Sequence, residues 1–328
     1  MKILYIYRHP NMGYSIGKVF RPIEEEMKKH AEVDSIYLPV PNYSLQGLWR
    51  NIRYARECCR KKKYDIVHIT GTEHYLLPFL NRQKVVVTVH DFGSIVVHNP
   101  IKAFFKNLLF INTLKFADVV TCISDKTKDE LHSLIRNIKQ ATTIYNPVGP
   151  EFKFKPKKFN IDNPIILHIG TKSNKNLENT IKALAGIKCH LRIIGELTPT
   201  QKENLQHCNI EYTNVWGLSD EDILKEYENC DIVNFPSLYE GFGMPIIEGQ
   251  SVGCAVLTSN ISPMKEVAAD AAVLVNPTCP ESIRKGYETL LSNPEKYIEK
   301  GLENIKRFTL SRISKEYLEI YNKIIRRL

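Results

Sequence analysis

Short runs of apolar, mostly β-branched residues alternate along the chain with longer stretches whose apolar positions recur every three or four residues. Runs of the first kind are typical of buried strands, and stretches of the second kind are typical of amphipathic helices. Their alternation predicts βαβ units and parallel sheets. In the first half the expected strands are 2–7, 35–40, 65–70, 84–90, 118–123 and 142–145, and the expected helices are 17–30, 46–62, 100–116 and 126–136.

The pattern is interrupted at 151–162, where Lys, Pro and Phe occur without helical periodicity, so this segment is expected to link two domains. The alternation then restarts and ends in a mostly helical tail, 293–328. Two successive α/β halves of about 150 residues each fit this pattern better than one large sheet. In the second half the expected strands are 164–169, 190–194, 231–235, 255–259 and 271–275, and the expected helices are 176–186, 219–229, 245–252 and 280–292.

The composition is that of an ordinary globular chain. Of its 328 residues, 43% are hydrophobic and 25% are charged, so a full core can be buried. There is no run of about 18 apolar residues and no secretory pattern at the N-terminus, so neither a transmembrane helix nor a signal peptide is expected. The eight cysteines are scattered without a C-x-x-C pair, which predicts a reducing, cytoplasmic location and neither a zinc site nor a redox motif.

The most informative stretch is 235–259, which is typical of a strand, a glycine-rich loop, a helix and a second strand. Gly241 and Gly243 allow the loop backbone to approach a ligand closely, and the proline that follows suits the first turn of a helix. Such a loop directs backbone amides and a helix N-terminus toward an anion such as a diphosphate. Glu240 and Glu248 lie on either side of this loop and can face one pocket.

This stretch reads E-G-F-G-x-P-x-x-E, with P-S before it and G-x-x-V after it. It resembles the E-x7-E signature of the retaining GT-B glycosyltransferases, which are group 1 or family 4-like enzymes of the mannosyl- or glucosyl-transferase type. The resemblance implies an α/β fold of two Rossmann-like domains that face each other across a cleft holding the donor. The implied parts are an acceptor-binding domain 1–155, a donor-binding domain 156–308 and a helix 309–328 that returns to the first domain.

The resemblance also implies roles for single residues of the second domain. The segment 165–177, I-I-L-H-I-G-T-K-S-N-K-N-L, resembles the first strand and loop of the family's second domain, which places Lys175 at the donor diphosphate. Many members carry Arg-Lys where Asn174 and Lys175 stand, so one phosphate-binding cation is missing here or Lys172 supplies it. The nucleotide base is implied to lie near 216–218, whose tryptophan is expected to pack rather than to stack on the base.

In the first domain the resemblance is thinner. The segment 84–91, K-V-V-V-T-V-H-D, resembles a strand whose histidine, here His90, approaches the transferred sugar and the acceptor. A histidine that only bonds to backbone at a strand end is the structural alternative, and both interpretations stay open. The segment 12–17 resembles a glycine loop over the donor phosphates. The implied catalytic residues are Glu240, His90 and Lys175, and the implied donor-binding residues are Gly13, Gly170, Thr171, Gly241, Phe242, Gly243, Met244 and Glu248.

Two other features of the sequence bear on metal binding and on partners. The D-x-D string at 220–222 follows Ser219, which predicts a helix cap rather than the metal site of another glycosyltransferase fold, so no metal or other cofactor is expected. The net charge of +9 is concentrated in two regions that also carry aromatic residues. These are a predicted helix with Trp49, Arg50, Arg53, Arg56 and Arg60 on one face, and the segment 101–116 with Lys102, Lys106 and Lys115.

Two interpretations of these basic regions stay open. They dock on an anionic membrane surface, or they are solvated helix faces beside core aromatics. No nucleic-acid-binding motif accompanies the charge, so nucleic acid is not an expected partner.

The expected function is therefore retaining transfer of a sugar from a UDP- or GDP-sugar to a hydroxyl of a glycan or lipid-linked acceptor. Cell-envelope polysaccharide synthesis is the expected setting, in the cytoplasm or peripherally on the inner face of the membrane. Two alternatives remain: a nucleotide-sugar epimerase on the same fold, and a non-catalytic scaffold subunit that binds sugar nucleotides.

Overall fold

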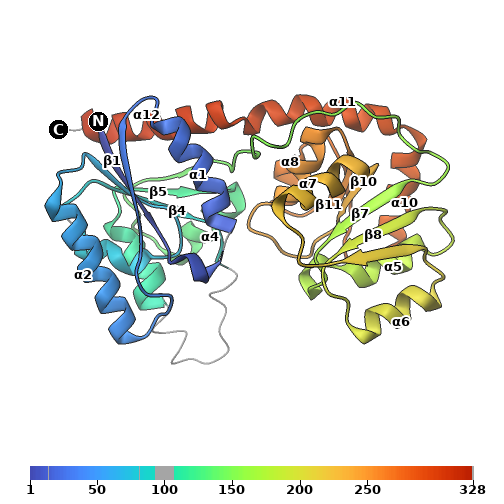
Figure 1. Ribbon diagram of the computed structural model, residues 1–328, viewed down its shortest axis with the longest axis horizontal. Coiled ribbons are helices and arrows are strands. Elements are labelled where there is room, and N and C mark those ends of the chain that lie inside the picture. Colours follow the sequence, from blue (N-terminus) through green and yellow to red (C-terminus); the bar gives the residue numbers. More distant parts are fainter. Residues whose placement is uncertain (14, 81, 93–106, 327–328) are drawn as a thin grey trace. The chain divides into compact units, whose positions relative to one another are not determined.

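The computed structural model describes residues 1–13, 15–80, 82–92 and 107–326. The chain divides into two compact units, and each contains one six-stranded parallel sheet with helices on both faces (Figure 1). Unit 1 comprises Met1–Gly149 together with Leu310–Leu328, and unit 2 comprises Pro150–Thr309. The predicted α/β architecture with parallel sheets is therefore confirmed.

The sheet of unit 1 has the strand order β2-β1-β3-β4-β5-β6. The central strands are continuous apolar runs because both faces of a parallel sheet are covered. The strands are β1 (Lys2–Tyr7), β2 (Glu32–Tyr37), β3 (Ile66–Ile69), β4 (Val85–Val89), β5 (Val119–Cys122) and β6 (Ala141–Thr143). The helices are α1 (Ser15–Met27), α2 (Leu45–Lys61), α4 (Asp125–Leu134) and α12 (Leu310–Arg326), with the short turns η1 (Pro10–Met12), η2 (His74–Phe79), η4 (Asn107–Ile111) and η5 (Asn112–Phe116).

Alternate residues of β1 show how the two faces of this sheet are used. Leu4 and Ile6 point to a core that α2, η2 and α4 cover, whereas Ile3 and Tyr5 point to a second core under α1 and α12. The helix α12 is thus an integral part of unit 1, and its residues Ile313, Tyr317 and Tyr321 are buried against the sheet.

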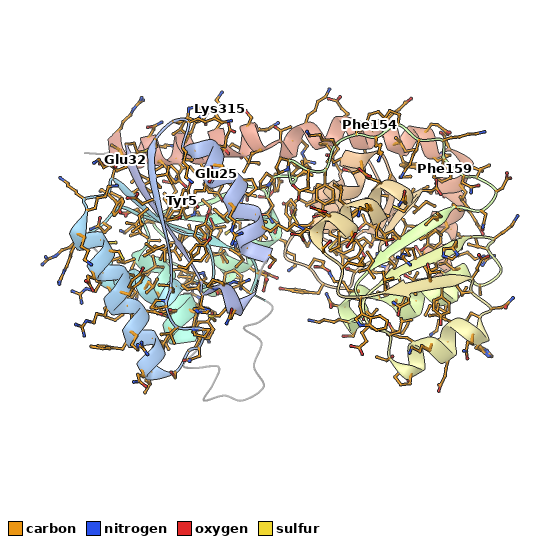
Figure 2. The ribbon with its side chains drawn as sticks, viewed as in Figure 1. Tyr5, Glu25, Glu32, Phe154, Phe159 and Lys315 are labelled. Atoms are coloured by element: carbon orange, nitrogen blue, oxygen red, sulfur yellow. The ribbon has the colours of Figure 1, made fainter. Side chains whose placement is uncertain are left out.

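A buried hydrogen-bonded group holds α12 on the sheet. His68 on β3 lies with Nδ1 2.6 Å from the Tyr321 hydroxyl and with Nε2 2.8 Å from Thr88 Oγ1. The Tyr321 hydroxyl also lies 3.1 Å from that of Tyr5, which Figure 2 shows within unit 1. Burial lowers the pKa of His68 to about 3, so its imidazole is neutral, with one ring nitrogen donating and the other accepting.

The sheet of unit 2 has the order β12-β11-β10-β7-β8-β9. Its strands are β7 (Ile165–Ile169), β8 (His190–Ile194), β9 (Tyr212–Val215), β10 (Ile232–Phe235), β11 (Ala255–Ser259) and β12 (Val273–Val275). The longer helices are α5 (Leu177–Leu184), α6 (Pro199–His207), α7 (Asp220–Asn229), α8 (Met244–Val252), α9 (Met264–Ala268), α10 (Pro280–Ser292) and α11 (Pro294–Asn304), with the short turns η6 (Ser173–Lys175) and η7 (Ile305–Phe308). One core lies under α5, α6 and α10.

The segment 151–162, expected as a linker, packs on unit 2. Phe152 is buried, and its carbonyl accepts a hydrogen bond from Ser251 Oγ at 2.7 Å. Phe154 lies against Gly253, and Phe159 packs on the core of unit 2 (Figure 2). The ammonium of Lys157 donates to the backbone carbonyls at 227, 228 and 230.

The predicted and observed elements differ in a few places. The second strand begins three residues earlier than expected, and β9, α6 and α9 were not expected at all. The predicted helix 100–116 lies partly outside the described residues, and its described part forms short irregular turns, η4 and η5.

We expect Tyr321→Phe to lower the free energy of unfolding by about 1–3 kcal/mol, because a buried ring nitrogen of His68 and the Tyr5 hydroxyl each lose a partner. Urea unfolding of the full chain, followed by circular dichroism, measures the change. The matched control is Tyr317→Phe, since the Tyr317 hydroxyl lies 3.3 Å from a Thr88 oxygen that has two other partners. A loss no larger than that of the control would contradict the interpretation.

Candidate functional site

The strand order of unit 2 reverses between β7 and β10. From there β8 and β9 follow on one side, and β11 and β12 follow on the other. Loops that leave neighbouring strands in opposite directions open a crevice at the carboxyl ends of the strands. Open α/β sheets bind nucleotides in such a crevice. The loop after β7 carries Lys175, and the loop after β10 carries Glu240.

Lys175 and Glu240 meet at this point. The Lys175 ammonium lies 2.6 Å from Glu240 Oε1 and 4.9 Å from the centroid of the Phe235 ring. The aliphatic part of Lys175 covers Gly170, where a Cβ would lie only 2.8 Å from Lys175 Cγ and where φ is +93°. The two charged side chains are 23% and 16% exposed, so their attraction is screened less than that of a surface pair.

Asn176 braces the loops around this ion pair. Its buried side-chain amide donates to the carbonyl of Pro236 at 2.9 Å and to that of Pro277 at 2.6 Å. It thereby connects the loops after β7, β10 and β12. The residue itself has φ +64°, a left-handed conformation that asparagine tolerates better than most residues. Asn174 adds a further connection, since its side-chain amide donates to the Tyr239 carbonyl at 3.2 Å.

The glycine-rich loop leads into the N-terminus of α8. Gly243 is the N-cap residue and brings no side chain to the first amides of the helix. A helix start of this kind suits a negatively charged group. Gly241 and Met244 are half-buried. Phe242 is buried, and its ring packs edge-on against that of Phe308 at a centroid distance of 5.9 Å, so its ring belongs to the core.

Glu248 lies one turn into α8 and is positioned by a different partner from Glu240. The Tyr227 hydroxyl donates to Glu248 Oε2 at 2.5 Å. Tyr227 is fully buried, and burial together with the nearby Glu248 charge raises its pKa well above the usual range. The phenol therefore keeps its proton and remains a donor to the carboxylate.

Three other residues singled out from the sequence have clear surroundings. Thr171 Oγ1 donates to the Glu196 carbonyl at 2.7 Å, which fixes the start of the loop after β7. Trp216 is 61% exposed, contrary to the expectation that it packs. Ser219 caps α7, accepting from the Asp222 amide at 3.2 Å, so the predicted helix cap is confirmed. Among the described residues, no three His, Cys, Asp or Glu side chains are grouped so that they could hold a metal ion.

In unit 1 the strand order reverses between β1 and β3. Arg8 follows β1, and its Nε donates to the carbonyl of Gly13 at 3.2 Å. The predicted glycine loop is therefore fastened to the carboxyl end of β1. This loop, the loop after β3 and the end of β4 lie at one edge of the sheet.

His90 directly follows β4 at this edge. Its Nε2 lies 2.8 Å from the Thr70 carbonyl, which can only accept, so Nε2 carries the proton and Nδ1 is an acceptor. Burial lowers the pKa of His90, which favours the neutral imidazole. The backbone bond expected by the structural alternative is thus present, and a role of His90 toward a sugar stays a prediction.

Glu73 is a residue that the sequence analysis does not single out. It is buried in the loop after β3, where Oε1 lies 3.4 Å from the Tyr43 hydroxyl and 3.3 Å from Thr72 Oγ1, while Oε2 has no hydrogen-bond partner. Burial raises its pKa to about 7, although the nearby charge of Arg8 opposes the shift. A carboxylate three residues after a predicted parallel strand is the signal that could have identified it.

Two family models match the chain, one in each unit. The model described as glycosyl transferases group 1 matches residues 150–306, and the model described as Glycosyltransferase Family 4 matches residues 19–152. Among curated relatives, the serotype-specific mannosyltransferase WbdA of Escherichia coli is 23% identical over 244 residues, or 69% of this chain. The chain spans 29% of the length of that relative.

Solved structures share the fold. A sucrose-phosphate synthase from Thermosynechococcus elongatus superposes with a TM-score of 0.82 at 16% identity, with both chains covered completely. Anabaena Alr3699/HepE, solved in complex with UDP and glucose, superposes with a TM-score of 0.73 at 15% identity, over 98% of this chain and 100% of that one.

We expect Asn176→Gly to destabilise unit 2 by about 1–3 kcal/mol, because it keeps the left-handed backbone but removes one donor from each of two buried carbonyls. The Pro277 carbonyl keeps another donor, the side-chain amide of Asn179 at 3.1 Å. Thermal unfolding of the full chain measures the loss. Asn209→Gly is the matched control, since Asn209 has a similar φ of +50° and is exposed. Equal effects of the two substitutions would show that the brace contributes nothing.

The free energy of unfolding should fall as pH rises from 5 to 8, and we expect Glu73→Gln to make this fall smaller. A carboxyl whose folded-state pKa is about 7, against 4.5 ordinarily, binds more protons folded than unfolded. The free energy of unfolding therefore falls as pH rises from about 4.5 to about 7, by about 3 kcal/mol in all, and Gln does not titrate. Melting temperatures across this range test the expectation, with the exposed Glu203→Gln as control. A variant that follows the wild-type profile would refute it.

Proposed function

We propose, for a chain that belongs to the group 1 glycosyltransferases, that it transfers a sugar from a nucleoside diphosphate donor to an acceptor hydroxyl with retention of configuration. The donor is a UDP- or GDP-sugar, and the acceptor is a glycan or a lipid-linked glycan of cell-envelope polysaccharide synthesis. A relative named as a mannosyltransferase and a structural neighbour that holds UDP support this choice.

The observation that carries the proposal is the Lys175–Glu240 pair at the reversal of strand order in unit 2. When the donor breaks, negative charge develops on the departing diphosphate and positive charge on the sugar ring. A fixed ammonium can stabilise the charge on the diphosphate, and the carboxylate beside it can stabilise the charge on the sugar ring. The three N–H groups of Lys175 can serve the diphosphate while one still bonds to Glu240.

The other residues take supporting parts in this proposal. The amides near Gly243 and the start of α8 bind the diphosphate, and Lys175 supplies the cation without a second basic residue beside it. Glu240 holds the sugar hydroxyls. Glu248, oriented by Tyr227, accepts hydrogen bonds from the ribose hydroxyls. His90 positions the sugar or the acceptor through its accepting Nδ1.

The acceptor must lose a proton as its oxygen bonds to the sugar. In this proposal the bond from the sugar to the diphosphate oxygen breaks, and that phosphate oxygen takes the acceptor proton. Retention follows when departure and attack occur on the same face of the ring. Trapping a covalent sugar adduct on a side chain, detected by mass spectrometry, would rule this route out.

Ligand-induced thermal shifts with UDP, GDP, ADP and their sugar conjugates test the donor site without any need for an acceptor. A nucleotide at about a hundred times its dissociation constant should stabilise the chain by about 2.7 kcal/mol. We expect Glu248→Ala and Lys175→Met to abolish this shift. Lys172→Met, an exposed lysine three residues earlier, is the matched control and should retain it. A reversed result for the two lysines would make Lys172 the phosphate-binding cation.

Product analysis then separates transfer from the alternatives. With donor and an acceptor, a transferase forms a glycoside whose anomeric coupling in NMR gives retention or inversion. Isomerised donor in the absence of acceptor would identify an epimerase. Nucleotide binding without turnover by any acceptor would favour a scaffold subunit.

A further inference from the structure

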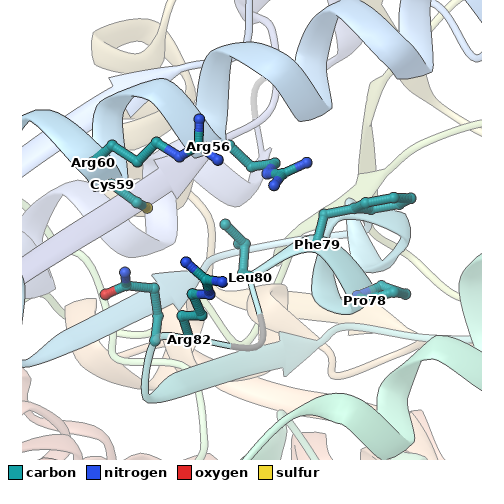
Figure 3. A pocket seen from close by; sticks show the side chains of 8 residues that line it. Arg56, Cys59, Arg60, Pro78, Phe79, Leu80 and Arg82 are labelled. Carbon is teal, nitrogen blue, oxygen red and sulfur yellow. The ribbon is translucent and has the colours of Figure 1, made fainter.

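A hollow between α2 and the turn before β4 gathers three arginines. Its volume is about 370 Å³, and Arg56 and Arg60 reach it from α2 while Arg82 reaches it from the turn (Figure 3). All three side chains are exposed. Within the described part of the chain, none of the three forms an ion pair. Like charges around one hollow repel one another, so the arrangement favours an anion between them.

Two further hollows continue this one, so the charge is spread over a surface. The second hollow, of about 340 Å³, shares Arg56 and Arg60 and extends along α2 to Trp49. The third, of about 320 Å³, shares Arg82 and extends toward the starts of β5 and β6. We call the surface over the three hollows the basic face. Its exposed basic residues are Arg53, Arg56, Arg60, Arg82, Lys115 and Lys139.

The acidic residues that line these hollows already have partners. Glu57 forms an ion pair with Lys61 at 2.9 Å. Asp118 pairs with Lys139 at 3.4 Å and accepts a hydrogen bond from the Val85 amide at 2.9 Å. The face nevertheless keeps an excess of positive charge, because six exposed basic side chains stand against these two acidic ones.

Apolar side chains stand among these cations. Trp49, Phe79 and Phe116 are 58%, 45% and 43% exposed, so these rings are not core aromatics. Two of them lie beside a cation, with the Arg53 guanidinium 5.6 Å from the Trp49 ring and the Lys115 ammonium 5.4 Å from the Phe116 ring. One helical turn before Trp49, and on the same side of α2, Leu45 is 86% exposed.

We propose that the basic face docks the chain on a bilayer that contains anionic phospholipids. Phosphates arranged in a plane match cations spread over three adjoining hollows, and aromatic rings favour the boundary between headgroups and acyl chains. An exposed leucine can insert among the apolar chains of a bilayer. Single-stranded nucleic acid stacks on aromatic rings but offers no such contact to a leucine. This proposal does not rest on the proposed sugar transfer.

The part of the basic face around Arg82 and Lys139 lies at the opposite edge of the unit 1 sheet from His90. Arg82 precedes β4 and Lys139 precedes β6, so both lie at the amino ends of the strands, whereas His90 follows the carboxyl end of β4. The first and third hollows therefore lie away from the edge that carries Glu73 and His90, and only the Trp49 end of α2 extends toward it. Substitutions in the face can accordingly be tested without altering residues of the candidate site.

Co-sedimentation of the full chain with vesicles is the first test. We expect binding to vesicles of phosphatidylcholine and phosphatidylglycerol at 0.1 M salt, and little binding to phosphatidylcholine alone. The triple variant Arg56→Gln/Arg60→Gln/Arg82→Gln should bind about a hundredfold more weakly, at about fivefold for each charge. The matched control is Lys182→Gln/Lys188→Gln/Lys202→Gln, which removes three exposed charges from unit 2 and should bind like wild type.

Tryptophan emission provides a second test that does not depend on the triple variant. The chain has two tryptophans, Trp49 and Trp216. In Trp216→Phe the remaining Trp49 should shift its emission to shorter wavelength on anionic vesicles, and brominated lipids should quench it. In Trp49→Phe the remaining Trp216 should show neither change.

Three results would overturn the proposal. They are equal binding of the two triple variants, an unchanged Trp49 emission on vesicles that bind the chain, and binding to a single-stranded oligonucleotide but not to anionic vesicles. Nucleotide-induced thermal shifts, measured on the same variants, report separately on the donor site and on correct folding.

Discussion

The side-chain amide of Asn176 ties together three loops that no strand pairing holds. In a parallel sheet the hydrogen-bonded ladder ends where the strands end, so the loops beyond it need other connections. Asn176 supplies them through the carbonyls of Pro236 and Pro277, and the Lys175–Glu240 ion pair is then set across two of the braced loops. The proposed donor site thus combines a pair of charges with a neutral amide that holds the surrounding loops, together with the Asn174 contacts.

Burial and charge are separated in unit 1. The histidines His68, His74 and His90 lie within or at the edge of the core, and burial lowers the pKa of each, so the interior carries little positive charge. The cations are instead collected on the outer side of α2 and at the amino ends of the strands. The carboxyl edge of the sheet therefore offers a neutral imidazole at His90, suited to a sugar hydroxyl, whereas the amino edge offers a field suited to phosphates.

Much of the fold could be predicted because buried parallel strands are continuous apolar runs, as in β1 and β4. The edge strand β9 has Thr213 and Asn214 at its centre and gives no such run. The helix α6 lacks an apolar stripe, although Thr198 and Gln201 form a capping box that could have marked its start. Lys175 and Glu240 were recognisable because each lies in a motif. The role of Asn176 in joining the loops could not be recognised, because its hydrogen-bond partners lie 60 and 101 residues away in the sequence.

The helix α12 belongs to unit 1, although the whole of unit 2 precedes it in the chain. During translation, unit 2 is therefore complete and able to fold while one apolar face of the unit 1 sheet still waits for its cover. A chaperone that recognises such a face would remain bound until α12 has left the ribosome. A stop codon just before Leu310 would yield a chain in which unit 2 is complete but unit 1 lacks the helix that covers one face of its sheet. The uncovered apolar face would make such a chain a target for proteases.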